Sequence, residues 1–556
     1  MKQFGFERRK AANLLGALIA IKIILLFTFA LHSRFVMDEF GQLGYARYLG
    51  NGLFDKVWPA KAVGSTAFYK LAHVIGWDAS SILLIGRMQT ALLACATLTI
   101  IYGCARTLGN DRVRSLAIIL VLLCFSNFME RIFRTIAEPL AVFFAAAALL
   151  VVLRGEADKA RTIIIAGILS GLSFLATQKA VYFNVALGLA LVADAAIARR
   201  YVDGIKRGGW LVLGWALPII AYCFVFGGAD PLPIARNLVL GPVEVATTGA
   251  NAYGGLRHYV VQTLVRNGLL YIFCFAGMIM ALRRITSLNE PRRVALIFSV
   301  VITALVFAHN QPWPYVFLMA LPFMALWSLE LVDLATADKR YVRIAWLALG
   351  IAVAASFVRN LDYLQFDNKV QLELVTRAEM LVGPDETYFD GVGMLPNRPE
   401  PTTLWLDRNY VLKTLHERAN SEAYRVLANS PPKIILWSYR MRDIYPVVAP
   451  LIQDSYVRVA PNLRMPGRRL KLGEPAIFDV PLAGNYALYS ATGTPQQGTV
   501  EIGGKEFDST IHLERGPRIV VLRTGPAAAM LLPEGSYIGA LAPGGDDAEL
   551  FAHVYD

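Results

Sequence analysis

Long apolar runs, separated by short polar stretches, fill the first two thirds of the chain. A helix that spans a bilayer needs roughly 20 mostly apolar residues, and about eleven runs approach or exceed that length. The pattern predicts a mainly α-helical membrane domain over residues 1–359, in which 162–178 and 180–198 are either two spans or a re-entrant or broken pair. The predicted spans are 12–31, 82–104, 115–128, 136–153, 162–178, 180–198, 210–227, 266–282, 293–309, 312–332 and 341–358.

The pattern changes near residue 360, where polar and charged side chains become frequent. A helical stretch from Asn409 to Leu427 is followed by a buried-strand candidate, Lys433–Ser438. A helical period followed by a short continuous apolar run is typical of a small α/β unit. We therefore expect a soluble α/β region over residues 360–472.

The last part of the chain, residues 473–556, consists of short segments in which apolar and polar positions alternate. Alternation with a period of two predicts strands, and glycine-containing pairs between them predict turns. Short strands at this spacing favour a β-sandwich or jelly roll. The expected turns are Gly484-Asn485, Gly503-Gly504, Gly516-Pro517 and Gly544-Gly545.

Composition supports the membrane assignment. Hydrophobic residues make up 56% of the 556 residues and charged residues only 17%, whereas soluble domains carry about 25% charged residues. The net charge of +12 does not indicate nucleic acid, because the basic residues lie in short clusters between apolar runs, where they set membrane orientation. We expect membrane lipids as partners and no nucleic acid.

The basic clusters also predict the orientation of the chain. Four basic residues precede the first apolar run, and cytoplasmic loops carry an excess of Lys and Arg. With this cluster in the cytoplasm, strict alternation of the helices puts five further clusters on the same side and the long loops 32–81 and 228–265 outside. The run Ala11–Leu31 is too long for a cleaved signal peptide. We expect a multi-pass protein of the inner (plasma) membrane with a periplasmic or extracellular C-terminal domain.

The sequence contains no zinc motif, P-loop, GxSxG or dinucleotide-binding fingerprint in a plausible context. Its five cysteines lie in or beside apolar segments and lack metal-site spacing. We therefore expect no cofactor and no metal, although an Asp-Glu pair can also belong to a cation site with oxygen ligands.

Two adjacent carboxylates, Asp38 and Glu39, follow the first predicted helix on the outer side. They are candidates for a general base at the membrane surface, because an acid held at that depth is costly without a partner or a purpose. Two solvated loop acids are the alternative. The loop beyond them is rich in aromatic and cationic residues, which favour the headgroup zone. It predicts one or two helices along the membrane surface, or a plain interfacial anchor.

The second candidate is an outer segment that contains Arg131, Arg134, Glu138 and Pro139. Arg134 and Glu138 stand four positions apart, so a surface ion pair on a helix explains them, and Pro139 fits a first helical turn. The alternative is a functional site, in which Glu138 lies at the outer mouth of the bundle and the arginines face an anionic group.

Two further outer segments place polar residues between apolar runs. Lys179 is either a ligand for an anion or a lysine that snorkels to the interface. His309 and Tyr315 flank a proline-rich break and are candidates to line a substrate pocket. A tight helical hairpin also explains the prolines of this break.

In their order and shared outer placement, these motifs resemble the polytopic glycosyltransferases of the C-type fold (GT-C), which include protein O-mannosyltransferases and the aminoarabinose transferases of lipid A. Asp38-Glu39 is similar to the acidic position of the family's first outer loop, and Glu138-Pro139 to its later acid followed by proline. The segment from Gly171 to Lys179 and the hairpin from Gln311 to Tyr315 also resemble family motifs. The resemblance covers roughly residues 10–330.

The resemblance implies transfer of a sugar from a polyprenyl-phosphate donor to a hydroxyl of a lipid, glycan or protein acceptor. Asp38 would be the general base, with Glu39 and Glu138 as further catalytic residues, and transfer would invert the sugar carbon. A transporter or flippase of an envelope precursor is the main alternative, and it predicts charges near the bilayer midplane and two related halves. A scaffold that displays the C-terminal domain is another. The implied phosphate ligands are Lys61, in a degenerate match to a Lys-Pro-Pro-like motif, Arg131, Arg134 and Lys179.

Overall fold

The computed structural model describes residues 2–50, 62–155, 159–248, 257–309, 314–334, 339–401, 406–490, 493–536 and 546–551. The chain divides into two compact units. Unit 1 consists of Met1–Ser33, Trp58–Leu71 and Leu84–Phe366, and unit 2 of Arg34–Val57, Ala72–Leu83 and Asp367–Asp556. Unit 2 therefore combines the C-terminal region with two pieces of the predicted first outer loop.

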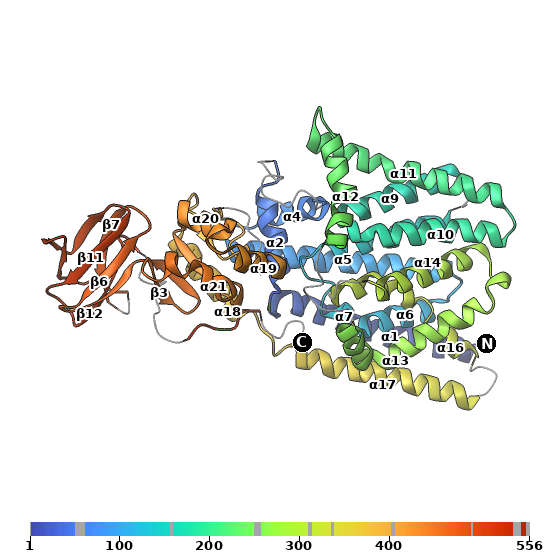
Figure 1. The fold of residues 1–556 in the computed structure, drawn as a ribbon. Helices are drawn as coiled ribbons and strands as arrows, with labels where there is room; N and C mark the ends of the chain where they lie inside the picture. The colour runs from blue at the N-terminus through green and yellow to red at the C-terminus, as the bar shows by residue number, and fades with distance from the viewer. Residues whose placement is uncertain are drawn as a thin grey trace. The chain divides into compact units, whose positions relative to one another are not determined.

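Unit 1 is a bundle of helices. Six helices in the described part of the chain are long and apolar enough to cross a bilayer, and the long helices run side by side (Figure 1). Large apolar side chains on them are exposed, for example Ile24, Leu217 and Ile272, as expected for a membrane protein whose surface meets lipid. The six are α1 (Lys2–His32), α5 (Ala79–Thr107), α10 (Val181–Ile197), α11 (Tyr201–Gly227), α13 (Arg257–Leu282) and α17 (Lys339–Tyr363).

Shorter helices fill the space between the long ones. The expected span at 115–128 is divided, because Phe125 is extended between two helices. The expected span at 312–332 is wrong as a single helix, since prolines that lack an amide N–H stand at the start of two of its pieces. These helices are α6 (Arg112–Cys124), α7 (Ser126–Met129), α8 (Glu138–Arg154), α9 (Ala160–Ala176), α14 (Glu290–Phe307), η3 (Pro314–Met319), α15 (Leu321–Ala325) and α16 (Glu330–Leu334).

The two long loops that were expected on the outer side contain helices. The first holds α2 (Met37–Arg47) and α4 (Gly64–Ile75), in line with the one or two helices expected there. The region 228–265, expected as a loop, contains α12 (Leu232–Thr248), which lies at a steep angle to α11 (Figure 1). Its hydropathy pattern is interrupted by Pro233, but proline fits the first turn of a helix, where its missing N–H costs no hydrogen bond.

Helices α9 and α11 approach closely through glycines. A Cβ atom at Gly214 would overlap the carbonyl oxygen of Ile164, and one at Gly167 would overlap that of Leu211. Gly167 and Gly171 form the small-xxx-small pattern that brings membrane helices together. The backbones of α9 and α11 therefore come into contact at glycines, which have no side chain to keep them apart.

Basic clusters that the positive-inside rule assigns to one side come together in unit 1. The buried carboxylate of Asp194 accepts hydrogen bonds from Arg207 at 3.1 Å and from Arg293 at 2.7 Å. Glu290 pairs with Arg207 at 2.9 Å and with Arg200 at 3.1 Å. The network ties α10 and α14 to the start of α11 and agrees with a common side for these clusters.

Unit 2 contains an α/β region, as the sequence predicts. Its four-stranded sheet has the order β1-β2-β4-β3, with β1 parallel to β2. The predicted strand within 433–438 is the buried strand β2. The predicted helix from Asn409 to Leu427 is two helices, because the chain turns at Arg418 (φ 52°). The elements are α18 (Lys369–Leu381), β1 (Tyr388–Phe389), α19 (Arg408–Glu417), α20 (Glu422–Asn429), β2 (Ile434–Leu436), α21 (Tyr439–Ile452), β3 (Tyr456–Ala460) and β4 (Leu463–Pro466).

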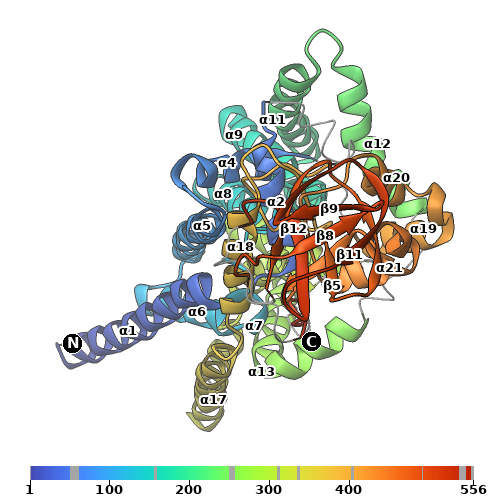
Figure 2. The same cartoon turned by 90° about the vertical axis from the view of Figure 1, so that its left-hand side faces the viewer.

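The remaining strands form two four-stranded antiparallel sheets, with the orders β10-β7-β12-β5 and β6-β11-β8-β9 (Figure 2). Side chains from both sheets share one hydrophobic core, so the predicted sandwich-like β region is confirmed. Gly503-Gly504 is the expected two-residue turn, whereas Gly484 and Gly516 begin strands; Gly544-Gly545 lies outside the described residues. The strands are β5 (Arg468–Lys471), β6 (Pro475–Val480), β7 (Gly484–Tyr489), β8 (Thr499–Ile502), β9 (Lys505–Asp508), β10 (Thr510–Leu513), β11 (Gly516–Leu522) and β12 (Ala528–Pro533).

Candidate functional site

Both candidate carboxylates of unit 2 lie in the first turn of α2. The residue before the helix, Val36, is extended, and its N–H donates to Oε1 of Glu39 at 2.9 Å. Glu39 is fully buried, whereas Asp38 is half-buried. The two residues therefore differ in role: Glu39 caps the helix, and Asp38 is the carboxylate that remains partly accessible.

The segment before α2 is held by α18, which fixes the direction of the helix. The side chain of Gln371 accepts a hydrogen bond from the Phe35 N–H at 2.7 Å and donates to the Phe35 carbonyl at 2.9 Å. Both bonds are buried, so they replace the water that would otherwise satisfy these backbone groups. Asp38 thus stands on a helix whose start is held by Gln371 at Phe35 and by Glu39 at Val36.

The charge of Asp38 acts on two phenol groups of unit 2. Burial raises the pKa of Tyr45 on α2, and nearby carboxylates including Asp38 raise it further. Burial also raises the pKa of Tyr439 at the start of α21, and Asp38 again adds to the rise. A phenol with a raised pKa stays protonated at neutral pH, so both groups can donate a hydrogen bond to a carboxylate or to a hydroxyl.

In unit 1, the segment with Arg131 and Arg134 is buried and irregular. The helix α7 begins against a kink in α13 at Asn267, whose Oδ1 accepts the Ser126 N–H at 2.9 Å. Residues 130–137 then form turns and bends before α8 begins at Glu138. The expected helical spacing of Arg134 and Glu138 therefore does not exist, because this stretch is not a helix.

The arginines of this segment form a cluster around a buried acid, Glu130. Arg134 donates through Nε to the Glu130 carbonyl at 2.9 Å and through its terminal nitrogen to the Tyr363 hydroxyl at 2.5 Å. Arg266 of α13 lies 3.6 Å from the Glu130 carboxylate. Burial raises the pKa of Glu130, and four guanidinium charges oppose that rise, those of Arg131, Arg266, Arg134 and Arg359. Four cations thus face one carboxylate, and we call these five residues the arginine cluster.

Glu138 and Lys179 form a separate ion pair. Lys179 Nζ lies 3.0 Å from Glu138 Oε1 and 4.5 Å from the centre of the Tyr315 ring. His309 is bonded through Nδ1 to the Tyr182 hydroxyl at 2.7 Å. Predicted site residues from three distant stretches of the sequence thus contribute to one region of unit 1, since Tyr182 stands one helical turn after Lys179. Their assignment as catalytic or substrate-contacting groups stays a prediction.

The sequence analysis did not identify Arg266, Arg359 or Lys22 as residues of the site. Arg266 lies inside α13 and Arg359 near the end of α17. Both stand at the expected outer ends of the predicted spans 266–282 and 341–358, and this position is the sequence signal that could have found them. Lys22, in the middle of α1, is fully buried and donates to Ser356 at 2.8 Å and to Asn360 at 2.5 Å. Lys61 lies outside the described residues. Within the described chain, no three His, Cys, Asp or Glu side chains are grouped as metal ligands.

Comparison with known proteins identifies the fold. The chain is similar to the structure of ArnT from Cupriavidus metallidurans bound to undecaprenyl phosphate, with a TM-score of 0.57 and 13% identity over 82% of this chain and 97% of ArnT. It is also similar to the apo oligosaccharyltransferase of Archaeoglobus fulgidus, with a TM-score of 0.50 and 14% identity over 90% of this chain and 76% of that one. The chain has a GT-C-type fold. The fold expected from the order of the sequence motifs is therefore confirmed.

The soluble part of this GT-C-type chain matches two sequence families. Residues 412–465 match DUF7056 and residues 468–533 match DUF7055, each described as a domain of unknown function. The first covers most of α19 through β4, and the second covers all the strands from β5 to β12. No curated protein matches the chain in sequence.

Proposed function

We propose that the protein is a membrane glycosyltransferase that moves a sugar from a polyprenyl-phosphate donor to a hydroxyl acceptor on the outer face of the plasma membrane. The arginine cluster carries this proposal. Arg131 and Arg134 are buried, and the charges of Arg266 and Arg359 also act on Glu130. Four guanidinium charges around one carboxylate attract an anion. A polyprenyl phosphate supplies such an anion, and its lipid chain suits a helical bundle with an apolar surface. The structure of ArnT bound to undecaprenyl phosphate, a protein of the same fold, supports this choice of donor.

The proposed reaction forms one bond and breaks one. The acceptor oxygen attacks the anomeric carbon of the sugar while the bond from that carbon to the phosphate oxygen breaks. The acceptor proton passes to Asp38, and the lipid phosphate leaves with an added negative charge. Attack opposite the leaving group inverts the anomeric centre. Fixed guanidinium groups beside the phosphate stabilise the charge that develops there and so lower the barrier.

The remaining predicted residues take supporting roles in this proposal. Glu39 positions Asp38, because its carboxylate is used to cap α2. Glu138 holds the ammonium of Lys179, which reduces the positive charge that Lys179 can offer to a phosphate. Lys22 does not favour the transporter alternative, since its buried ammonium is satisfied by fixed partners on α17.

The test is sugar transfer by the purified, detergent-solubilised protein from radiolabelled polyprenyl-phosphate sugars to a cell-envelope extract. Arg266→Ala should weaken donor use about tenfold to hundredfold, the loss expected for one hydrogen bond to a charged group. Arg283→Ala is the matched control, because Arg283 is exposed just beyond the opposite end of α13. No transfer with any donor, from folded wild-type protein, would contradict the proposal. Equal donor use by Arg266→Ala, Arg131→Ala and the control would show that the cluster does not hold the phosphate.

A further inference from the structure

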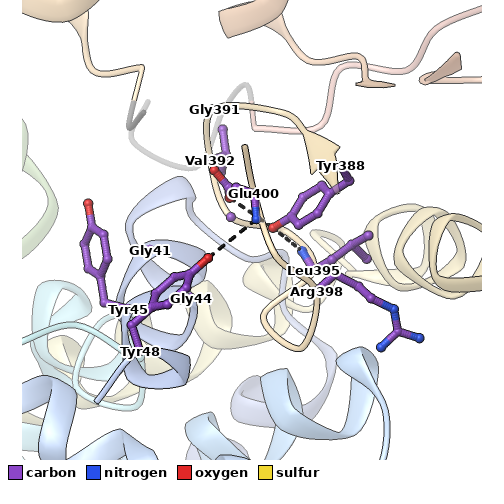
Figure 3. Close-up of a pocket in the computed structure, with 11 residues that line it drawn as sticks. Gly41, Gly44, Tyr45, Tyr48, Tyr388, Gly391, Val392, Leu395, Arg398 and Glu400 are labelled. Atoms are coloured by element: carbon purple, nitrogen blue, oxygen red, sulfur yellow. Dashed lines mark hydrogen bonds between the residues drawn. The ribbon is translucent and has the colours of Figure 1, made fainter. Parts of the chain in front are cut away.

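A hollow in unit 2 lies between α2 and the loop that follows β1 (Figure 3). It contains about 360 Å³ of empty space, which includes solvent at its open mouth. Three phenol rings and one carboxylate line it together with glycine backbone. The residues that matter here are Gly41, Tyr45 and Tyr48 from α2 and its cap, with Tyr388, Gly393 and Glu400 opposite them.

The wall opposite α2 is fixed by a buried aspartate. Oδ1 of Asp390 accepts the N–H groups of Val392 and Gly393 at 2.7 Å, and Oδ2 accepts that of Met394 at 2.8 Å. Gly391 and Gly393 have φ values of 67° and 89°, a conformation that side chains disfavour. The loop is therefore held in one shape by its own carboxylate.

The hollow and Asp38 lie on one face of the same helix. Asp38, Gly41, Tyr45 and Tyr48 follow each other at spacings of three, four and three residues, which is the spacing of side chains along one helix face. Gly41, between Asp38 and Tyr45 on that face, lines the hollow and adds no side chain there. A molecule seated in the hollow would thus extend along α2 towards Asp38.

The polar groups of the hollow suit hydroxyl groups. The Tyr388 hydroxyl donates to Glu400 Oε1 at 3.0 Å and accepts the Leu395 N–H at 3.1 Å. The Tyr48 hydroxyl accepts the Glu400 N–H at 3.5 Å. Burial raises the pKa of Tyr48 and of Tyr388, and the charge of Glu400 raises both further. Protonated phenols beside a carboxylate offer the donors and acceptors that neighbouring hydroxyls of a sugar require.

Charge and backbone pairing narrow the choice of ligand. The carboxylates of Glu400, Asp407 and Asp38 all act on Tyr45, while Arg398 pairs with Glu379 at 3.3 Å. Arg398 lines the hollow and Arg47 acts on Tyr48, but Arg398 is already paired, so three carboxylates outweigh the cations around the rings and disfavour an anion. A peptide strand has no free edge at β1 near Tyr388, because the Tyr388 N–H already donates to the Pro399 carbonyl at 3.2 Å.

We propose that this hollow binds one neutral sugar unit of a carbohydrate acceptor, with the hydroxyl to be glycosylated directed along α2 towards Asp38. The acceptor is thus a glycan rather than a peptide or an anionic lipid headgroup. This inference rests on the proposed function, because it assumes that Asp38 deprotonates the acceptor. Tyrosine rings supply flat apolar faces for the C–H groups of the sugar, and Glu400 with the phenols reads its hydroxyls.

The test measures acceptor use and donor use separately on the full chain in detergent. Neutral oligosaccharides, their uronic-acid counterparts and a serine- and threonine-rich peptide serve as acceptors. Tyr48→Phe and Tyr45→Phe should each raise the acceptor KM about threefold to tenfold, and Glu400→Gln at least tenfold, with donor affinity unchanged. Tyr410→Phe is the matched control, since the Tyr410 hydroxyl bonds to Glu422 outside the hollow. Ligand-detected NMR gives oligosaccharide binding without donor.

Each outcome decides the inference. Selective binding and use of neutral oligosaccharides, weakened by the three variants and not by the control, support it. Unchanged acceptor KM in all three variants, or preferential use of the peptide or of the uronic-acid acceptor, overturns it. If Glu400→Gln fails to fold by thermal unfolding, the two tyrosine variants decide, because each preserves its ring. If the wild-type protein transfers sugar and the variants of the hollow leave acceptor KM unchanged, this inference alone is refuted. If the wild-type protein transfers no sugar at all, the proposed function is refuted.

Discussion

The two neighbouring carboxylates of α2 give the sharpest test of the proposed mechanism. Asp38→Asn keeps the shape of the side chain and removes the proton acceptor. Glu39→Gln keeps an oxygen that can accept the Val36 N–H, now bonded to Glu39 at 2.9 Å. The variants stand on adjacent residues of one helical turn, so any general disturbance of α2 should affect both.

The expected magnitudes differ by orders of magnitude. Loss of a general base costs about 10²–10⁴-fold in rate, which is about 2.7–5.4 kcal/mol of activation free energy. For Glu39→Gln, a charged hydrogen bond becomes a neutral one, a loss of about 1 kcal/mol. Since Glu39 is fully buried and contacts the backbone, that loss should appear in the free energy of unfolding. The rate of Glu39→Gln should stay within about tenfold of wild type.

The assay compares sugar transfer and donor binding on the same folded preparations, at saturating donor and acceptor. Asp385→Asn is the matched control, because Asp385 is an exposed aspartate of unit 2. Donor affinity should survive in Asp38→Asn, as an amide leaves the arginine cluster unchanged. Near-normal turnover by Asp38→Asn would refute the assignment of the base. A large loss in Glu39→Gln with full activity in Asp38→Asn would assign the base to Glu39 instead.

Three further predictions concern the fold. Gly214→Val should lower the yield of folded protein and destabilise unit 1 by about 1–3 kcal/mol or more, because its Cβ would overlap the Ile164 carbonyl. The control is Gly209→Val, since Gly209 is an exposed residue of the same helix. Equal thermal stability of the two variants would contradict the close packing of α9 and α11. Asp390→Ala should destabilise unit 2 by about 3 kcal/mol or more, because three buried N–H groups lose their acceptor, and Asp390→Asn should cost less. Burial raises the pKa of Asp390 above its usual value of 3.8, so ionisation opposes folding, and the stability of the wild type relative to Asp390→Asn should fall as pH rises from that value. A stability difference that stays flat from about pH 3.5 to about pH 6 would argue against it. A reporter that is active only outside the cytoplasm should be active when fused after Asp556, and an inactive fusion in an inserted protein would refute the orientation.

Local patterns predicted local structure well. The apolar run near residues 12–31 is a continuous helix, and Gly503-Gly504 forms a tight turn between β8 and β9, since both glycines adopt positive φ. The pairs that start at Gly484 and Gly516 were also expected to be turns, but both glycines begin strands, because the chain reverses before them. The stretch 312–332 is apolar enough for a span, yet its prolines divide it, which hydropathy alone does not register.

The candidate site was predictable as a set of residues but not as an arrangement. In the sequence, Asp38 and Glu39 are equivalent neighbours, and the cap to Val36 separates them only in three dimensions. Arg134 and Glu138 have helical spacing, but bends intervene and Glu138 pairs with Lys179, 41 residues away. The partners of a buried charge depend on which helices pack together, and no local pattern encodes that.

The arrangement changes which cation best suits the phosphate. Lys179 and Glu138 are 3.0 Å apart, so at the distance of a bound phosphate their opposite charges largely cancel. In the arginine cluster, four guanidinium groups act on one carboxylate, and an added phosphate meets a surplus of positive charge. At an effective dielectric constant of 20, two unit charges 4 Å apart interact with about 4 kcal/mol, which exceeds the net attraction of a close pair of opposite charges for a phosphate. The phosphate should therefore bind at the arginine cluster, and Lys179, held by Glu138 above the Tyr315 ring, is better placed to orient the sugar or to shield the site from water.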